Sequence, residues 1–490
     1  MIKKLEIKLL PDDLENEEKI KNQILRKVKV DPQRIQSILL DRKSIDARGR
    51  IPKFILRYNV YIDELPEEEK GIIPSLANYS DRPEVLIIGA GPAGYFAALE
   101  LLRLGLKPVV LDRGKDVQSR RRDLRAIQQE GKVDPDSNYC FGEGGAGTYS
   151  DGKLYTRSLK RGNYFGVLKV LVEHGANTDI LVDAHPHIGS NKLPKIVAEI
   201  RQTIEKFGGE IHFNTKVVDF IVHNENLKGV RDQEGKEYRA QATILATGHS
   251  ARDIYDLLAE KNVKLEAKDF AIGVRVEHPQ PLIDEIQYGQ RDRHENLPAS
   301  SFKLVTQVKE KGVFSFCMCP GGLIVPAATS PGELVVNGMS LSRRDSPYAN
   351  SGFVTAVDER DYGGEKDDIF AGLGFQRNLE QAFFDHGDGS QKAPAQRMTD
   401  FVLRKESIDL NSTSYIPGIY SAPLHKMLPI HIYDRLAQAL EIFKYKMRGF
   451  YTDEANLVGL ESRTSSPIRI PRNRENFMHE EIGGLFPCGE

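Results

Sequence analysis

The segment at 85–114 constrains the fold of this chain more than any other. It reads VLIIGAGPAGYFAALELLRLGLKPVVLDRG. The apolar run at 85–88 predicts a buried strand, an apolar helix then extends to about residue 104, and 108–111 predicts a second strand. Strand, helix and strand with glycines at the first turn are typical of a βαβ unit that binds a dinucleotide.

Each glycine of this unit has a physical role. Gly89 makes the tight turn from strand to helix, Gly91 lets the backbone approach a pyrophosphate, and Gly94 lets the helix pack closely on the sheet. The helix N-terminus directs unpaired N–H groups and a positive dipole end at the phosphates. Asp112 follows the second strand, where a carboxylate can accept hydrogen bonds from a ribose. A glycine-rich turn without a ligand is the alternative, and the agreement of strand, helix and acid disfavours it.

Composition bounds the class of protein. A chain of 490 residues is too long for one core, so two or three domains are expected. The net charge of −2 indicates no field suited to nucleic acid or to an anionic membrane. Four cysteines do not make a disulfide framework, and neither a signal peptide nor a membrane span is visible. We therefore predict a cytoplasmic protein that does not bind a membrane and for which nucleic acid is not an expected partner.

The predicted fold class is α/β. We expect a Rossmann-like dinucleotide-binding domain in three layers, with a parallel sheet and a β-meander, an inserted mixed α+β substrate domain and a small N-terminal module. A strand at 2–10, a helix at 14–28 and a strand at 53–62 suggest that this module is ferredoxin-like. The expected ranges are 1–80 for the N-terminal module, 84–255 and 445–490 for the dinucleotide-binding domain, and 256–444 for the substrate domain.

Further elements follow from hydrophobic periodicity. The predicted helices are at 193–207 and about 434–447, and the predicted strands are at 210–213, 216–222, 229–232, 237–240, 242–246, 272–278, 312–322 and 333–339.

A second glycine-rich segment, FGEGGAGTYSDGK, occupies 141–153. Four glycines in six residues expose N–H groups that could bind an anion or let a flat ring approach. It follows no strand and is therefore not a second dinucleotide fingerprint. A flexible surface loop is the alternative, but Glu143, Ser150, Asp151 and Lys153 favour a site.

Together these motifs resemble a known family. The likeness covers GAGPAG, LDRG, FGEGGAGTYSDGKL, PHIGSNKL, ATGHSARD, GVRVEHP, FCMCPGG, VNGMSLSRRDSPYANSG, ESRTSSPIRIPR and LFPCGE, and so extends over essentially the whole chain. The chain is similar to bacterial FAD-dependent dehydrogenases of an uncharacterised FAD-binding group within the glutathione-reductase-type flavoproteins. The resemblance implies an FAD-dependent oxidoreductase that moves a hydride between flavin N5 and a small organic substrate.

The resemblance also implies the residues that would bind FAD. The glycine turn would hold the pyrophosphate, Asp112 the ribose, Val217 or Val218 the adenine, the second glycine segment the ribityl and flavin region, and Glu490 the ribityl chain. The implied set is Gly89, Gly91, Pro92, Ala93, Gly94, Asp112, Arg113, Gly144, Gly145, Ala146, Gly147, Ser150, Asp151, Gly152, Val218, Ala246, Thr247, Gly248 and Glu490.

In relatives of this type the motif at Glu490 continues into a glycine-rich turn and a helix whose N-terminus faces the flavin. We therefore hypothesise that this sequence is a truncated version of a longer protein. An immediate stop codon after Glu490 in the reading frame would contradict that hypothesis.

Three residues are candidates for catalysis. His185 and His187 lie in DAHPHIG, where imidazoles could donate or accept protons near neutral pH, although loop caps are an equal alternative. Arg463 could bind a carboxylate or phosphate. His249 has a status similar to the histidines, and Ser465 could meet substrate beside Arg463.

Cysteines and arginines have simpler readings. Cys317 and Cys319 lie two apart on a predicted strand, so both point to one face; a redox pair is possible, but two buried core thiols are favoured. Cys140 is interpreted as packing, and no metal site is predicted. The arginines at 343, 344, 469, 472 and 474 could form an anion or RNA patch, although solvated charge is favoured.

No second dinucleotide fingerprint follows a strand, so NAD(P)H is expected at most as a transient reductant, and an electron-donor protein is the other possibility. Two further functions remain open. One is an RNA-modification or RNA-binding flavoprotein, which the balanced charge disfavours. The other is a non-catalytic sensor that binds FAD.

Overall fold

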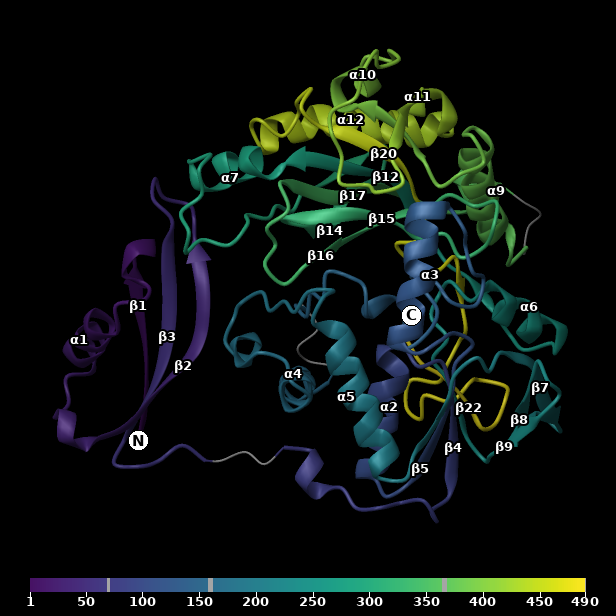
Figure 1. Ribbon diagram of the computed structural model, residues 1–490, viewed down its shortest axis with the longest axis horizontal. Helices are drawn as coiled ribbons and strands as arrows, with labels where there is room; N and C mark the ends of the chain where they lie inside the picture. The colour runs from purple at the N-terminus through teal and green to yellow at the C-terminus, as the bar shows by residue number, and fades with distance from the viewer. Residues whose placement is uncertain (68–70, 157–161, 364–367, 490) are drawn as a thin grey trace.

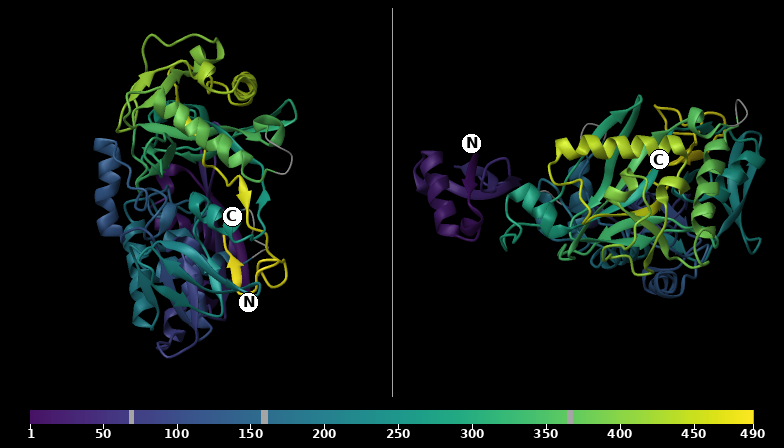
Figure 2. Two further views of the ribbon diagram at one scale, coloured as in Figure 1. Left: turned by 90° about the vertical axis from the view of Figure 1, so that its right-hand side faces the viewer. Right: turned by 90° about the horizontal axis from the view of Figure 1, so that it is seen from above.

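The computed structural model describes residues 1–67, 71–156, 162–363 and 368–489. Three main sheets organise it: an N-terminal sheet, a five-stranded sheet and a seven-stranded sheet. Figure 1 shows the N-terminal module at one side, the five-stranded sheet low in the molecule and the seven-stranded sheet above it. The right-hand view of Figure 2 shows the N-terminal module as a lobe that projects from the rest.

The N-terminal module is smaller than a ferredoxin-like fold. Its strands are β1 (Ile2–Leu9), β2 (Ile35–Asp46) and β3 (Lys53–Ile62), with α1 (Glu17–Val28) between the first two. Central β3 pairs antiparallel with both neighbours. A ferredoxin-like fold has four strands and two helices, whereas residues 1–62, all of them described, contain this βαββ unit. That prediction is therefore corrected.

The chain runs on from this module to β4 (Glu84–Ile88) of the five-stranded sheet, and side chains attach the module to the seven-stranded part. Tyr288 and Leu297 pack into its core, and His294 Nε2 lies 2.7 Å from Asp12 Oδ1. On its other edge, the backbone of Lys43 in β2 exchanges hydrogen bonds with Val182 and Ala184. These contacts hold the module against both larger parts of the chain.

The five-stranded sheet contains the predicted βαβ unit. Its order is β22-β10-β4-β5-β6, and all its strand pairs are parallel, which confirms the predicted parallel sheet. The strands are β4 (Glu84–Ile88), β5 (Lys107–Leu111), β6 (Glu210–His212), β10 (Thr243–Leu245) and β22 (Leu485–Pro487).

Alternating residues of β4 face two different layers. Val85 and Ile87 pack against the helices α2 (Pro92–Arg103) and α5 (Leu193–Lys206). Leu86 and Ile88 pack on the opposite side, in one cluster with the antiparallel meander. The meander strands are β7 (Val217–His223), β8 (Asn226–Asp232) and β9 (Glu237–Arg239). Because side chains alternate along a strand, one short apolar run holds both layers together.

The charged segment after this unit is helical. Asp116 accepts hydrogen bonds from the backbone N–H groups of residues 118 and 119 and so caps α3 (Val117–Glu130). Two further helices of this part are α4 (Tyr164–Glu173) and α6 (Arg252–Glu260).

The seven-stranded sheet has the order β13-β14-β17-β12-β20-β18-β19. Its strands are β12 (Phe270–Pro279), β13 (Val305–Val308), β14 (Lys311–Cys319), β17 (Tyr348–Val357), β18 (Ala393–Arg397), β19 (Ile419–Ser421) and β20 (Asn456–Glu461). The hairpin β15 (Gly322–Pro326) and β16 (Val336–Ser340) accompanies it, with the helices α7 (Gln280–Tyr288), α8 (Glu359–Tyr362), α9 (Ala371–Asp385), α10 (Met398–Val402), α11 (Leu424–Met427) and α12 (Ile430–Lys446).

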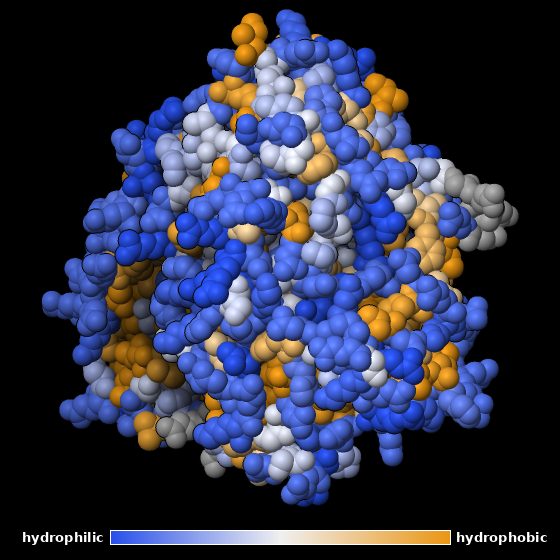
Figure 3. Space-filling model, turned by 45° about the vertical axis from the view of Figure 1, so that its right-hand side comes forward, coloured by the Kyte–Doolittle hydropathy of each residue, from blue (hydrophilic) through white to orange (hydrophobic). Residues whose placement is uncertain are grey.

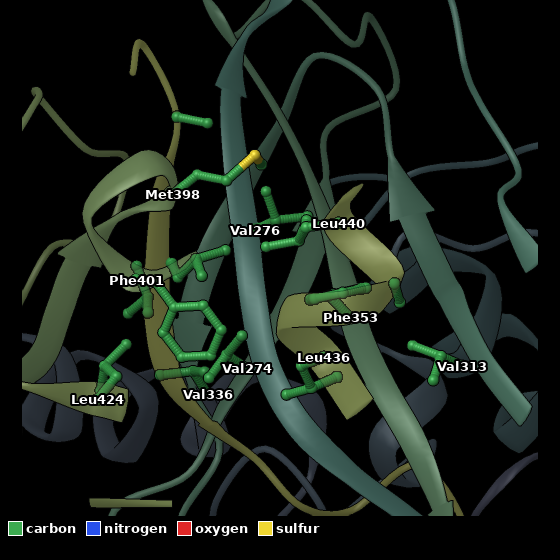
Figure 4. Packing of buried hydrophobic residues seen from close by; sticks show 14 of the residues in the cluster. Val274, Val276, Val313, Val336, Phe353, Met398, Phe401, Leu424, Leu436 and Leu440 are labelled. Atoms are coloured by element: carbon green, nitrogen blue, oxygen red, sulfur yellow. The ribbon is translucent and has the colours of Figure 1, made fainter. Parts of the chain in front are cut away.

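The core of this sheet is the largest in the molecule. Figure 4 shows Leu436 and Leu440 of α12 beside Val274 and Val276 of β12, with Phe353 of β17 next to them. Each of these side chains is at most 1% exposed. Burial of many such side chains, at about 1.5–3 kcal/mol each, anchors α12 on the sheet.

The predicted range 445–490 contributes strands to both large sheets and one strand, β21 (Ile468–Arg469), to a small sheet with β11 (Glu266–Ala267). Central β20 pairs with β12 and β18 of the seven-stranded sheet, whereas β22 pairs with β10 of the parallel sheet. The chain therefore returns from one sheet to the other after residue 461, and the assignment of this whole range to the dinucleotide-binding domain is corrected for β20.

The surface is mostly hydrophilic. Figure 3 shows scattered hydrophobic residues and one hollow, at the left of that view, with a hydrophobic lining. Among the helices that the structure describes, none has the length and apolar character needed to cross a bilayer.

Helical glycines allow a direct test of the packing of α2. A Cβ on Gly94 would lie 1.9 Å from the carbonyl oxygen of Gly89, whereas a Cβ on Gly374 in α9 meets nothing within 4 Å. We expect Gly94→Ala to lower the free energy of unfolding by about 1–3 kcal/mol through overpacking. The matched Gly374→Ala variant should raise it by up to about 1 kcal/mol. Denaturant unfolding measures both, and equal stabilities would contradict the packing described here.

Candidate functional site

The turn between β4 and α2 is built from backbone. Gly89 has a φ of 106°, which favours glycine, and a Cβ there would lie 2.4 Å from the carbonyl oxygen of Ala246. Gly91 is the N-cap of α2 and Pro92 its first residue, a position where a missing N–H costs nothing. A Cβ on Gly91 would have no neighbour closer than 3.9 Å, so this position has open space in front of it.

Asp112 connects the turn to the end of β5. Its Oδ2 accepts a hydrogen bond from the N–H of Ala90 and its Oδ1 accepts one from the N–H of Gly114, both at 2.8 Å. Each carboxylate oxygen has a further lone pair, so the side chain can still accept hydrogen bonds from a ligand. The neighbouring Arg113 forms an ion pair with Asp253 at 2.6 Å and lies 4.6 Å from the centre of the Phe141 ring.

The second glycine segment is anchored rather than flexible. The buried Glu143 carboxylate accepts hydrogen bonds from Tyr95 Oη, Arg201 Nε and the backbone N–H of Val117, at 2.8–2.9 Å. The fully buried Arg120 of α3 donates to the carbonyl oxygens of residues 138, 143 and 145, each at 2.8 Å. Because residues 141–145 are buried, the alternative of a mobile surface loop is wrong.

The two glycine segments lie against each other. A Cβ on Gly145 would lie 3.1 Å from the Cα of Gly91, and one on Gly147 would lie 2.8 Å from the Cγ of Pro92. Between them and the strand ends lies one cavity. Its wall comprises Ile88, Gly89, Gly91, Pro92, Ala93, Leu111, Asp112, Arg113, Cys140, Phe141, Gly145, Ala146, Gly147, Thr215, Val217, Ala246, Thr247, Gly248, His249, Ser250, Ile254, Asn337, Arg463, Cys488 and Gly489.

Several expected residues lie elsewhere. Gly94, a residue of α2 itself, packs against the carbonyl group of Gly89. Gly144, with a φ of 74°, packs against Thr148 and Val197. Val217 is buried and forms part of the wall, whereas Val218 is 37% exposed and is not among the wall residues. Glu490 lies outside the described residues.

Ser150, Asp151 and Gly152 are not among the cavity-lining residues either. The buried Asp151 carboxylate accepts a hydrogen bond from Ser340 Oγ at 2.5 Å and pairs with Arg344 Nη2 at 2.6 Å. Lys153 Nζ lies 3.8 Å from it and His187 Nε2 lies 3.9 Å from it. Burial opposes ionisation, but the charges of Lys153 and Arg344 outweigh it and lower the pKa of Asp151. We call these five residues the Asp151 cluster.

The two candidate histidines are not cavity-lining residues. The His187 imidazole lies 3.1 Å from Ser340 Oγ, and burial together with the Arg344 charge lowers its pKa to about 4. His185 is exposed and its ring centre lies 4.8 Å from that of Tyr155. His187 is therefore a neutral member of the Asp151 cluster at ordinary pH.

Arg463 does reach the cavity, but its guanidinium is already occupied. It pairs with Glu333 and Glu380 at 2.7 Å and donates to Thr329 Oγ1 at 2.5 Å. The same two carboxylates pair with Arg252 at 3.0 and 2.8 Å. Since Glu380 is fully buried, this network is structural, and Arg463 is not free to bind an anionic substrate.

Wall residues that were not expected from the sequence include Thr215, Ser250, Ile254, Asn337, Cys488 and Gly489. Asn337 comes from β16 and therefore from outside the parallel sheet. In the sequence, Asn337 is marked only by its position in the VNGM motif. No local sequence pattern indicates that this strand approaches the glycine segments, which lie far from it along the chain.

The arginines at 343, 344, 469, 472 and 474 either contact other residues of the chain or are exposed. Arg344 pairs with Asp151, Arg469 with Glu266 at 3.4 Å, and Arg472 donates to the carbonyl oxygen of Pro487. Arg343 and Arg474 are exposed. Three of these five arginines are therefore engaged within the chain.

The lowered pKa of His187 predicts a loss of stability in acid. Between the ordinary pKa of 6.5 and the folded value of about 4, the unfolded chain binds a proton that the folded chain does not. Stability therefore falls as the pH decreases through this window, by about 2 kcal/mol at pH 5 from this group alone. His187→Gln removes that part of the loss. The free energy of unfolding is measured in urea at pH 7.5 and pH 5, with His223→Gln at an exposed strand end as the control. If His187→Gln loses as much stability in acid as the wild-type protein, the lowered pKa of His187 is contradicted.

Family models match three parts of the chain. Residues 82–129 match a model described as an FAD binding domain, and residues 269–464 match the C-terminal domain-like model of an FAD-dependent protein. Residues 1–61 match a domain of unknown function. The glycine turn and Asp112 lie within the first of these matches, and so does α3 except for its last residue.

Solved structures are only distantly similar. CtdE in complex with FAD is 11% identical, with coverage of 83% of this chain and 76% of that chain and a TM-score of 0.31. The tetracycline destructase Tet(51) is 13% identical, with coverage of 62% and 64% and a TM-score of 0.30. Likeness of this degree carries no argument here.

A curated relative is much closer. It is an uncharacterised protein of Clostridium beijerinckii, 37% identical over 500 residues, with coverage of 98% of this chain and 92% of the relative. Together with the FAD-binding and FAD-dependent models, this match shows that the chain belongs to the same family as the clostridial protein, a family of FAD-binding flavoproteins.

Proposed function

We propose that this flavoprotein is an oxidoreductase that transfers a hydride between FAD and a small organic substrate. The observation that carries the proposal is the composition of the cavity wall. One end consists of the glycine turn and Asp112 from the parallel sheet, and Asn337 and Arg463 come from the segments around the seven-stranded sheet. A cofactor held at the first end would therefore extend toward a surface made by the second.

The residues of the first end fit an FAD molecule. Pyrophosphate would lie at the N-terminus of α2, where Gly91 leaves open space and Ala93 presents a backbone N–H. Asp112 would accept hydrogen bonds from the ribose, and Val217 and Ile254 provide an apolar surface for the adenine. Gly145, Ala146 and Gly147 would allow the flavin to approach the backbone closely.

FAD supplies the two-electron chemistry when bound, and the protein supplies position and electrostatics. The Arg120 and Glu143 contacts hold the second glycine segment in place, so the wall is formed before a ligand binds. The Asn337 amide and the His249 imidazole can hydrogen-bond to a ligand at the wall. His185 and His187 stay candidates for proton transfer, and of the two only His187 belongs to the Asp151 cluster.

The cavity wall offers a test of the cofactor site that leaves the fold intact. Gly91 has an ordinary φ of −73° and space for a methyl group, so Gly91→Ala should fold normally. The added methyl would stand where the pyrophosphate must approach, and we expect FAD affinity to fall by about tenfold or more. Titration of the apoprotein with FAD, followed by flavin fluorescence, measures the change. Gly374→Ala is the matched control, and unchanged affinity in Gly91→Ala would place the pyrophosphate elsewhere.

Hydride transfer predicts that a nicotinamide could reduce the flavin transiently. Rapid anaerobic mixing of the FAD-loaded protein with NADH or NADPH should bleach the visible flavin absorbance. Dithionite reduction of the same sample shows that the flavin is reducible. Bleaching by dithionite but by neither nicotinamide would count against NAD(P)H and favour an electron-donor protein.

A further inference from the structure

Cys317 and Cys319 lie at an irregularity of β14 beside the Asp151 cluster. The register of β14 against β17 shifts between Phe316 and Cys319, and Cys317 has a φ of 51°. Such a bulge redirects side chains and is common next to active sites. Cys319 is fully buried, whereas Cys317 is half-buried, so the expectation of two inert core thiols describes only Cys319.

One cation contacts both sulfur atoms. Lys153 Nζ lies 3.9 Å from Cys317 Sγ and 3.6 Å from Cys319 Sγ. Its side chain is one-third exposed, so solvent reaches this side of the pair. A second cation, the fully buried Arg275, donates to the carbonyl oxygen of Cys317 at 2.8 Å and lies 3.8 Å from Cys319 Sγ.

These contacts divide the two thiols into different roles. A hydrogen bond from the Cys319 thiol, with the charges of Lys153 and Arg275, lowers the pKa of Cys317 to about 5, although burial opposes it. The same hydrogen bond and burial raise the pKa of Cys319. The carboxylates nearby, Asp151 and Glu461, act against the thiolate but are themselves paired with cations. A stabilised thiolate next to a protonated thiol is the arrangement of a nucleophilic and a resolving cysteine.

The pair is also connected to the cavity. Arg275 Nη1 lies 3.4 Å from Oδ1 of Asn337, which is a wall residue, and pairs with Glu461 at 2.8 Å. Gly338 makes this contact possible, because a Cβ there would lie 2.0 Å from Arg275 Nη2. One side chain therefore separates the two sulfur atoms from the wall.

We infer that Cys317 and Cys319 form a dithiol centre that exchanges with small-molecule disulfides. The Cys317 thiolate attacks one sulfur of the disulfide RSSR, which forms a Cys317–SR mixed disulfide and releases RS⁻. Cys319 then loses its proton and attacks the Cys317 sulfur, which closes the Cys317–Cys319 disulfide and releases the second RS⁻. The protein pair loses two electrons and RSSR gains them. The exchange is independent of hydride transfer and does not require FAD.

Thiol counting on the full chain tests the exchange directly. The protein is reduced, separated from the reductant and incubated with oxidised glutathione at pH 7. The reaction is then stopped with acid, free thiols are alkylated, and the masses of the peptides are determined by mass spectrometry. We expect Cys317 and Cys319 to become one internal disulfide without retained glutathione, while Cys140 and Cys488 stay alkylated. Cys319→Ser should stop at the glutathione adduct on Cys317. Cys317→Ser should slow oxidation of Cys319 on the order of tenfold or more. Four alkylated cysteines after incubation would overturn the proposal.

A spectroscopic measurement keeps the proposal testable if a cysteine variant does not fold. Thiolate absorbance of the wild-type protein is followed against pH. We expect one thiolate to form with a midpoint near 5. Lys153→Met should move this midpoint upward by about one pH unit or more, whereas Lys303→Met at an exposed loop should not. A wild-type titration in which every thiol ionises near the ordinary pKa of about 8.5 would also overturn it. Neither measurement depends on flavin reduction, so failure here is distinguishable from failure of the proposed oxidoreductase function.

Discussion

The backbone contact between the two glycine segments is the constraint on which the site depends. Gly91 and Gly145 approach so closely that a side chain on Gly145 would lie within 3.1 Å of the other backbone. Such a contact is stable only if the second segment is held from behind. Arg120 donates hydrogen bonds to carbonyl oxygens of the second segment. Glu143 accepts hydrogen bonds from donors in α2, α3 and α5. Buried charged groups satisfied in this way fix one geometry rather than many.

A second buried network fixes the parallel sheet against the seven-stranded part. Arg252 of α6 and Arg463, which follows β20, share the carboxylates of Glu333 and Glu380. Removing one partner would leave an unpaired buried charge, which typically costs 3–5 kcal/mol. The network lies where Arg463 reaches the cavity wall, so the geometry that holds the two parts together also shapes the cavity. Arg463, which we predicted as a catalytic residue from the sequence, therefore has a structural position.

Sequence patterns predicted elements well where apolar periodicity was regular. The unit at 85–114 and the meander are examples, since their strands and helix bury faces that consist of apolar residues. Strand β2 was not predicted, because two register shifts interrupt its alternation. Helix α3 was not predicted, because its inward-facing Arg120 binds carbonyl oxygens instead of joining an apolar stripe. Periodicity detects apolar burial and does not detect a buried charge whose partners are distant in sequence.

The dinucleotide turn could be deduced from the sequence, because the spacing of Gly89, Gly91 and Gly94 between strand and helix is the pattern of one βαβ unit. Which residues meet the cavity follows from the path of the whole chain. Asp151, close to the glycine segment in sequence, turns to Ser340 and Arg344, whereas Asn337 arrives from a distant strand. That path also brings Lys153 to the sulfur atoms of Cys317 and Cys319. The physical reason is that a side chain's direction follows from local geometry, but its partner depends on the path of the whole chain.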